Sequence, residues 1–181
     1  ISDDVLKSMR RGVTGKRTRE LINRLRDRIP DITLRTTFIV GYPNETEKEF
    51  EELCSFVQES KFDRAGTFTY SPEENTSSFI LGDPVPEEVK NERKDRLMEI
   101  QKEISLEKNS SFVGKKLNVL VESVEGDYYI ARSYRDAPEV DGEILIPQKN
   151  IDLKKGNFFS VEVYDYNEYD LFANLTDNRR K

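Results

Sequence analysis

The sequence contains no histidine, no tryptophan and a single cysteine, Cys54, among its 181 residues. The lack of histidine excludes Ser-His-Asp and Cys-His catalytic groups and any His-ligated zinc site. One cysteine can neither form an internal disulfide nor hold an iron–sulfur cluster by itself. No apolar run approaches the roughly 20 residues that a membrane-spanning helix needs, and no signal peptide opens the chain. We therefore expect a cytoplasmic protein that does not contact a membrane.

The chain begins at Ile1 rather than at methionine, and a helix start, Ser2-Asp3-Asp4, follows at once. This beginning predicts a piece cut from a longer protein, with a processed or engineered terminus as the alternative. Charged residues make up 35% of the chain and the net charge is -6. The 8 Tyr and 10 Phe supply enough bulk for a core, so a wholly disordered chain is not expected.

Helical and strand patterns alternate before residue 112. Thr46 and Glu49 form a T-x-x-E capping box ahead of an apolar helical stripe, and the β-branched run at 33–41 indicates a strand buried on both faces. The expected helices span 2–10, 16–29, 47–60 and 86–109, and the expected strands span 33–41 and 64–70. This α/β order favours a parallel sheet that is part of a larger (β/α) barrel.

The pattern after residue 112 is all-β. Turn signals such as Gly126-Asp127 and Asp141-Gly142 separate five short runs. The expected strands span 116–124, 127–133, 142–147, 158–166 and 169–175. Five strands in so short a stretch predict a small closed barrel of the OB type.

Charge is spread unevenly along the chain. Residues 1–35 carry 10 basic and 5 acidic residues, whereas residues 112–175 carry 7 basic and 12 acidic residues, a net charge of -5. Barrels that bind RNA usually present a basic face, because phosphate contacts dominate the affinity. The acidic barrel therefore favours a basic protein partner, although ordinary solvation also accounts for many acidic residues.

Several stretches resemble one known family in their order and spacing. They are SDDVLKSMRRG (2–12), TTFIVGYPNETEKEFEEL (36–53), FDRAGTFTYSPEENT (62–76), VPEEVKNERKDRLMEIQKEIS (85–105) and ARSYRDAPEVDG (131–142). Together they are similar to the methylthiotransferases, which are radical S-adenosylmethionine (SAM) enzymes with a C-terminal TRAM domain. The resemblance covers about residues 1–175. It is greatest to the RimO branch, which modifies an aspartate of the twelfth small-subunit ribosomal protein.

The resemblance implies an organisation and a chemistry. Residues 1–111 would be the C-terminal part of a radical SAM (β/α) barrel, residues 112–175 the TRAM barrel, and residues 176–181 a tail. The full-length enzyme would use SAM and two [4Fe–4S] clusters to methylthiolate the β-carbon of the aspartate. This chain lacks the cysteines that hold both clusters, so we expect it to be inactive alone and to carry no catalytic or metal-binding residue of its own.

The resemblance also implies cofactor-binding residues. Thr37, Ile39 and Gly41 match part of a GxIxGxxE motif that packs the adenine of SAM, and Tyr70 follows at the next strand end. The match is incomplete, because Thr37 replaces the first glycine and Asn44 replaces the glutamate. An ordinary strand core ending in a glycine, with Tyr70 as an aromatic that lines the barrel, is the alternative.

The substrate would be met by the loop at 132–142. Its carboxylates, Asp136, Glu139 and Asp141, are the expected substrate-binding residues for the basic ribosomal protein. The basic pair Arg10-Arg11 could meet a carboxylate or a phosphate, but a solvated helix face is the simpler interpretation. Cys54 lies among apolar helix positions and is expected to be a buried structural thiol.

Two alternatives remain open from the sequence. One is methylthiolation of tRNA adenosine, as in the MiaB branch, which a broadly positive TRAM surface would favour. The other is a non-catalytic adaptor that binds RNA or protein. The acidic barrel makes RNA binding the weaker interpretation, and the ribosome is a further candidate partner.

Overall fold

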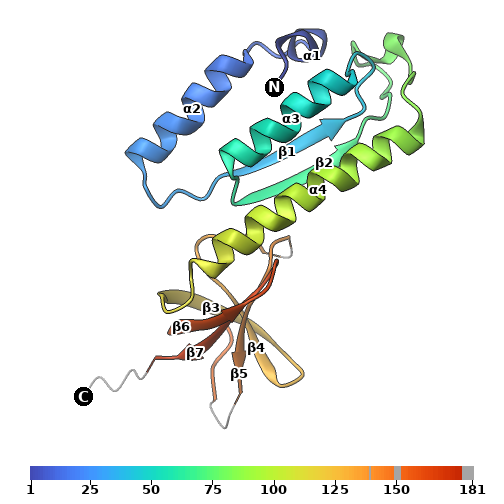
Figure 1. Cartoon of the computed structure of the whole chain (residues 1–181). Helices are drawn as coiled ribbons and strands as arrows, with labels where there is room; N and C mark the ends of the chain where they lie inside the picture. The colour runs from blue at the N-terminus through green and yellow to red at the C-terminus, as the bar shows by residue number, and fades with distance from the viewer. Residues whose placement is uncertain (139, 149–151, 177–181) are drawn as a thin grey trace. The chain divides into compact units, whose positions relative to one another are not determined.

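The computed structural model describes residues 1–138, 140–148 and 152–176. The chain divides into two compact units, Ile1–Ile104 and Ser105–Lys181. The elements of the first unit are, in chain order, α1 (Asp3–Ser8), α2 (Gly15–Arg28), β1 (Arg35–Val40), α3 (Glu47–Ser60), β2 (Arg64–Thr69), η1 (Phe79–Leu81) and α4 (Glu87–Ser110), whose last turns belong to the second unit (Figure 1). All the expected helices and strands of this region are confirmed, and only the short η1 was not predicted.

Local sequence signals fix the ends of the helices. The Thr46 N–H donates to the Glu49 carboxylate (3.0 Å), which completes the expected capping box of α3. The same helix ends at Lys61, whose left-handed backbone (φ 43°) lets its N–H bond the Val57 carbonyl. The Thr14 hydroxyl accepts the N–H of Arg17 and so caps α2.

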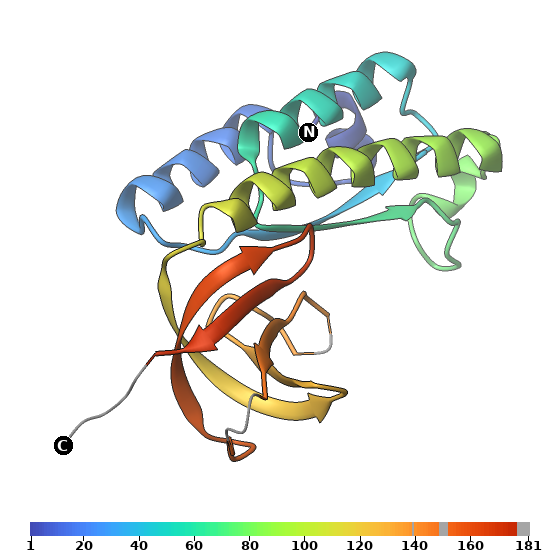
Figure 2. The ribbon, with the colours of Figure 1, turned by 60° about the horizontal axis from the view of Figure 1, so that its bottom comes forward.

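The sheet of the first unit has two parallel strands, with Arg35 of β1 opposite Arg64 of β2 and Val40 opposite Thr69. Figure 2 shows α2, α3 and α4 on one side of these strands. Burial along β1 alternates, because Val40 is buried while Thr37 and Ile39 are exposed. The prediction that this strand is buried on both faces is therefore wrong for the described residues: one face packs on helices and the other is open.

The core of the first unit lies between the sheet and its helices. Aromatic rings dominate it, with Phe38, Phe56 and Phe62 meeting edge to face at centroid distances of 5.7–6.4 Å. Cys54 is buried in the same cluster, as expected. The other buried apolar members are Ile22, Val40, Phe50, Leu53, Val57, Leu97 and Ile104.

The second unit contains a closed five-stranded barrel, which confirms the fold predicted for the region after residue 112. Its strands are β3 (Lys116–Glu125), β4 (Tyr128–Arg132), β5 (Ile144–Pro147), β6 (Phe158–Tyr166) and β7 (Leu171–Leu175). They follow the order β3-β4-β5-β7-β6, and β3 pairs with β6 to close the ring. β5 and β7 pair in parallel, whereas the other strand pairs described in the barrel are antiparallel.

The barrel interior is filled by apolar side chains from alternate strand positions. The buried core consists of Leu117, Val119, Val121, Tyr129, Ala131, Ile144, Ile146, Leu153, Val161, Val163, Leu171 and Ala173. The expected tail 176–181 lies outside the described residues except for Thr176. Among the described residues, no helix is both long and apolar enough to cross a membrane.

Candidate cofactor pocket and acidic loop

Three of the four expected cofactor residues line one cavity. Thr37 and Ile39 lie on the open face of β1, and Tyr70 follows the end of β2. The cavity has a volume of about 580 Å³. Its wall also contains Met9, Arg10, Arg11, Tyr42, Phe68, Thr69, Ser71, Glu73, Thr76, Ser77 and Ser78. Apolar surface, hydroxyl groups and two guanidinium groups therefore meet at this edge of the sheet.

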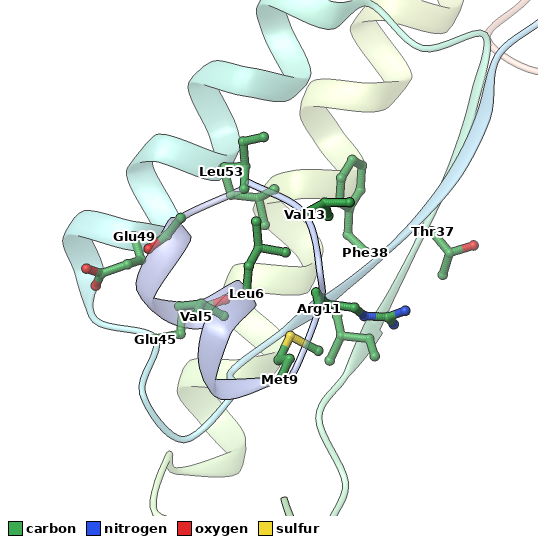
Figure 3. Close-up of a pocket in the computed structure, with 13 residues that line it drawn as sticks. Val5, Leu6, Met9, Arg11, Val13, Thr37, Phe38, Glu45, Glu49 and Leu53 are labelled. Atoms are coloured by element: carbon green, nitrogen blue, oxygen red, sulfur yellow. The ribbon is translucent and has the colours of Figure 1, made fainter. Parts of the chain in front are cut away.

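A second cavity of about 350 Å³ lies between α1, α3 and β1. Figure 3 shows Val5 and Leu6 of α1 and Leu53 of α3 around it, with Arg11 following α1. Thr37, Ile39 and Arg11 border both cavities. Met9 lines both cavities as well, so the two cavities beside β1 share four lining residues.

The ring of Tyr70 is fixed rather than free. The residue is 6% exposed, its ring meets Tyr42 edge to face at 5.2 Å, and its hydroxyl donates to the Ser78 carbonyl at 3.2 Å. Its N–H bonds the Val40 carbonyl at 2.9 Å, which continues the pairing of β1 and β2. Tyr70 therefore contributes a rigid wall to the cavity.

Gly41 does not line either cavity. Its backbone has φ +73°, and a Cβ built on it would lie 2.2 Å from Cγ of Lys90. The left-handed backbone and the close lysine side chain both require glycine here. Its part in cofactor binding stays a prediction, whereas its packing against Lys90 is what the structure shows.

Lys90 is buried and crosses from α4 to the end of the sheet. Its ammonium group contacts Asp83 Oδ2 (2.8 Å) and Glu87 Oε2 (2.8 Å) and donates to the Tyr70 carbonyl (3.2 Å). The hydrogen bonds to Asp83 and Glu87 raise the pKa of Lys90. A buried positive charge therefore lies next to Gly41 and Tyr70.

A second buried ion pair joins α4 to the loop before α3. Arg93 Nη1 donates to Glu45 Oε1 at 2.9 Å and to the Glu45 carbonyl at 3.1 Å, and the Gly41 N–H reaches the same Oε1 at 2.8 Å. Burial raises the pKa of Glu45, although the Gly41 N–H and Arg93 act in the opposite direction. Glu45 thus connects the strand end to α4.

The two classes of implied cofactor fit these residues differently. A nucleoside finds an open apolar and hydroxyl surface at Thr37 and Ile39, and a Cβ at Gly66, which pairs with Thr37, would meet nothing within 4 Å. Cys54 is buried away from this surface and burial raises the pKa of its thiol. Among the described residues, no group of three or more His, Cys, Asp or Glu could hold a metal. The surface at Thr37 and Ile39 is thus compatible with the nucleoside of SAM, and its binding there stays a prediction.

The acidic loop between β4 and β5 uses its carboxylates internally. Asp136 Oδ2 accepts the N–H (3.0 Å) and hydroxyl (2.7 Å) of Ser133, and Asp141 Oδ2 accepts the N–H of Ala137 (2.7 Å). Glu139, the third expected substrate residue, lies outside the described residues. Asp136 and Asp141 therefore shape the loop, and their contact with a substrate stays a prediction.

Sequence reasoning missed the buried charges of α4. Of the apolar positions Val89, Leu97, Ile100 and Ile104 only Leu97 and Ile104 are buried, and the other buried side chains of this helix in the first unit are Lys90, Arg93 and Gln101. These positions are three or four residues apart, so helical spacing could have identified them. Lysine and arginine are rarely buried, so an apolar pattern alone does not point to Lys90 and Arg93.

Comparisons with known proteins agree with this geometry. Residues 1–57 match the radical SAM superfamily and residues 113–176 match the TRAM domain. The chain is 45% identical to a protein named ribosomal protein uS12 methylthiotransferase RimO from Christiangramia forsetii, with 100% of this chain aligned to 41% of that protein. Proteins of the same name from Bacteroides fragilis (49% identity, 97% of this chain, 41% of the relative) and Aquifex aeolicus (46%, 98% and 41%) are also similar.

The chain belongs to the radical SAM methylthiotransferase family. This membership confirms the resemblance inferred from the motifs, and it accounts for the order of an α/β unit followed by a TRAM barrel. The chain spans about two fifths of the length of these relatives.

Proposed function

We propose that this chain serves a methylthiotransferase that acts on ribosomal protein uS12, with the α/β unit forming part of the SAM pocket and the barrel docking the substrate. The observation that carries the proposal is the 45–49% identity to proteins named for this reaction, which extends through both units. The target is the β-carbon of an aspartate. A ribosomal protein substrate implies a cytoplasmic location.

The cofactor contacts of this chain would be made by Thr37, Ile39 and Tyr70. Ile39 offers an apolar surface for a purine ring, Thr37 offers a hydroxyl, and the fixed ring of Tyr70 excludes water from one side. Arg10 and Arg11 border the same cavity and supply the charge that an amino acid carboxylate needs. SAM, when bound, would supply the radical chemistry and the methyl group.

The two [4Fe–4S] clusters need cysteines beyond those found here. The sequence has only Cys54, which is buried in the helical core. Thiolates are the usual ligands of such clusters. We therefore expect the cluster ligands on residues outside these 181, and expect the 181-residue chain to be inactive by itself.

The barrel would receive the basic substrate. Residues 112–175 carry a net charge of -5, which attracts a basic protein and repels RNA phosphates. Asp136 and Asp141 accept hydrogen bonds from Ser133 and Ala137, so a substrate would meet these two carboxylates in fixed positions. This charge favours protein over tRNA as the substrate.

A segment exchange tests the proposal. The 181 residues replace the corresponding segment of the B. fragilis relative, and the chimera is assayed for methylthiolation of uS12 by mass spectrometry. Modified uS12 is the expected product. A chimera that folds and carries its clusters but modifies tRNA, or modifies neither molecule, contradicts the assignment.

A single residue tests the cofactor pocket in the same chimera. Gly66→Val fills the open space beside Thr37 and is expected to weaken SAM binding by at least about tenfold, since the added side chain would occupy space that a ligand over the strand needs. Thr67→Val, on the buried face of the same strand, is the matched control. Equal SAM affinity in both variants would show that no ligand lies over Gly66.

A further inference from the structure

Three aromatic side chains gather on the outside of the barrel. The ring of Phe172 on β7 lies 6.4 Å from Tyr128 on β4 and 6.4 Å from Tyr164 on β6, centroid to centroid. We call Tyr128, Tyr164 and Phe172 the aromatic strip. Tyr164 is 45% exposed, and the other two rings are half-buried. The strip thus runs across strands that lie apart in sequence but are joined in the sheet.

The strip faces outward because its neighbours face inward. Tyr129, Leu171 and Val163 all belong to the barrel core, and successive side chains of a strand point to opposite faces. A bulge in β6 between Val163 and Asp165 interrupts the ladder at Tyr164. The three rings are therefore not needed to fill the interior.

Two of the three rings of the strip are paired with a carboxylate. Glu125 is the cross-strand partner of Tyr128, and Asp165 is the partner of Phe172, so each carboxylate shares the outer face with its ring. Glu143 lies near them. Burial, then the charges of Glu125, Asp170 and Glu122, raises the pKa of Glu143, which indicates a concentrated negative field.

A hollow of about 560 Å³ borders the strip at Tyr164. Glu162 and Leu175 line it, together with Lys116, Asn174 and Thr176. Among the described residues no cation forms an ion pair with Glu162, although Lys116 lies opposite it in the β3–β6 register. The hollow thus offers an apolar wall, an aromatic ring and a carboxylate together.

We propose that the aromatic strip binds cationic side chains, arginine above all, of a basic protein partner. This inference rests on the proposed function for the identity of that partner as a ribosomal protein. A guanidinium stacks on aromatic rings while it donates to carboxylates beside them. Glu125 and Asp165 place such carboxylates next to two of the rings.

The same rings would be a base-stacking platform on a basic barrel. Many OB-type barrels bind single strands in that way, with aromatic stacking and a positively charged groove. Here the carboxylates of Glu125, Glu143 and Asp165 would repel the phosphates that must follow each base. The local charge therefore favours arginine over nucleotides as the occupant.

Peptide binding to the 181-residue chain tests the inference. The probes are a fluorescent decapeptide of alternating arginine and glycine and a fluorescent decamer of oligouridylate, both measured by anisotropy at low salt. Tyr164→Ala is expected to weaken peptide binding roughly 3- to 30-fold. Phe158→Ala is the matched control, because Phe158 is an exposed aromatic on the same strand, roughly 20 Å along it.

The outcomes separate cleanly. Glu125→Gln and Asp165→Asn should each weaken the peptide and flatten its salt dependence, while Phe158→Ala should leave it unchanged. Equal losses in Tyr164→Ala and Phe158→Ala, or no loss in either, overturn the inference, as does tighter binding of oligouridylate than of the peptide. Because no methylthiolation is measured, failure here leaves the segment exchange to decide the proposed function separately.

Discussion

Different interactions stabilise the barrel and the α/β unit. The barrel is closed by the pairing of β3 with β6, and its interior is filled with apolar side chains. The α/β unit has only two strands, leaves one sheet face open, and buries Glu45, Lys90 and Arg93 in its packing. A closed sheet has no free edge, whereas the α/β unit is held partly by charges whose loss is costly. Substitutions of charged residues should therefore destabilise the barrel less than the α/β unit.

The largest difference in lost stability between the two units is expected for two arginine substitutions. Arg93→Ala in the α/β unit leaves Glu45 buried without its partner and should lower the free energy of unfolding by about 3–5 kcal/mol. Arg132→Ala in the barrel breaks a partly exposed pair with Glu122 and should cost less than about 1 kcal/mol. Urea unfolding measures both values. Equal losses would remove the distinction between the units.

Two glycine substitutions sharpen the contrast. Gly41→Ala and Gly126→Ala both place a side chain at positive φ, which costs roughly 1–2 kcal/mol. Gly41→Ala also drives a Cβ against Lys90, while a Cβ at Gly126 meets nothing within 4 Å. The first should therefore cost roughly 1–3 kcal/mol more than the second. Thermal unfolding measures the difference, and identical costs would mean that the lysine moves aside freely.

A third prediction concerns pH. The pKa of Glu45 is raised in the folded chain, so the stability that this carboxyl contributes is complete below its unfolded pKa, near 4.5, and is lost as the pH rises through the folded value. Glu45→Gln removes this titration. The stability of the variant relative to the wild type should increase as the pH rises above about 4.5. The opposite trend would show that Arg93 outweighs burial at Glu45.

The smallest effect is expected in the acidic loop. Asp136→Asn weakens the acceptor for both donors of Ser133 and should destabilise the barrel by about 0.5–2 kcal/mol. Asp127→Asn, in the hairpin between β3 and β4, changes the charge equally and should have almost no effect. Chemical unfolding compares them. Similar small losses of stability in both variants would show that Asp136 contributes through its charge and not through its hydrogen bonds.

The sequence predicted the elements better than it predicted their surroundings. The Thr46–Glu49 capping box and the regular turn signals of the barrel are local, and local hydrogen bonds decide where helices and strands end. The exposure of Ile39 depends on what packs over β1, which local pattern does not determine. The close contact of Gly41 with Lys90 joins positions far apart in the chain, so no spacing rule could reveal it.

The sequence identified candidate site residues, but it did not predict the contacts that they make in the fold. The family motif selected Thr37, Ile39 and Gly41, and Tyr70 was added from the next strand end. Thr37, Ile39 and Tyr70 line one cavity, whereas Gly41 does not. The carboxylates of the loop at 132–142 were selected for their charge, but two of them serve the backbone of their own loop. A charge is visible in a sequence, whereas the donor that it meets depends on the folded turn.

The buried Cys54 thiol can report on the opening of the α/β unit. Burial raises the pKa of that thiol, which keeps it protonated and shielded from alkylating reagents while α3 is in place. Alkylation of this one sulfur would therefore follow the opening of the α/β unit, while the barrel, which has no thiol, would contribute no signal. Pulse labelling could thus time the loss of one unit without any engineered probe.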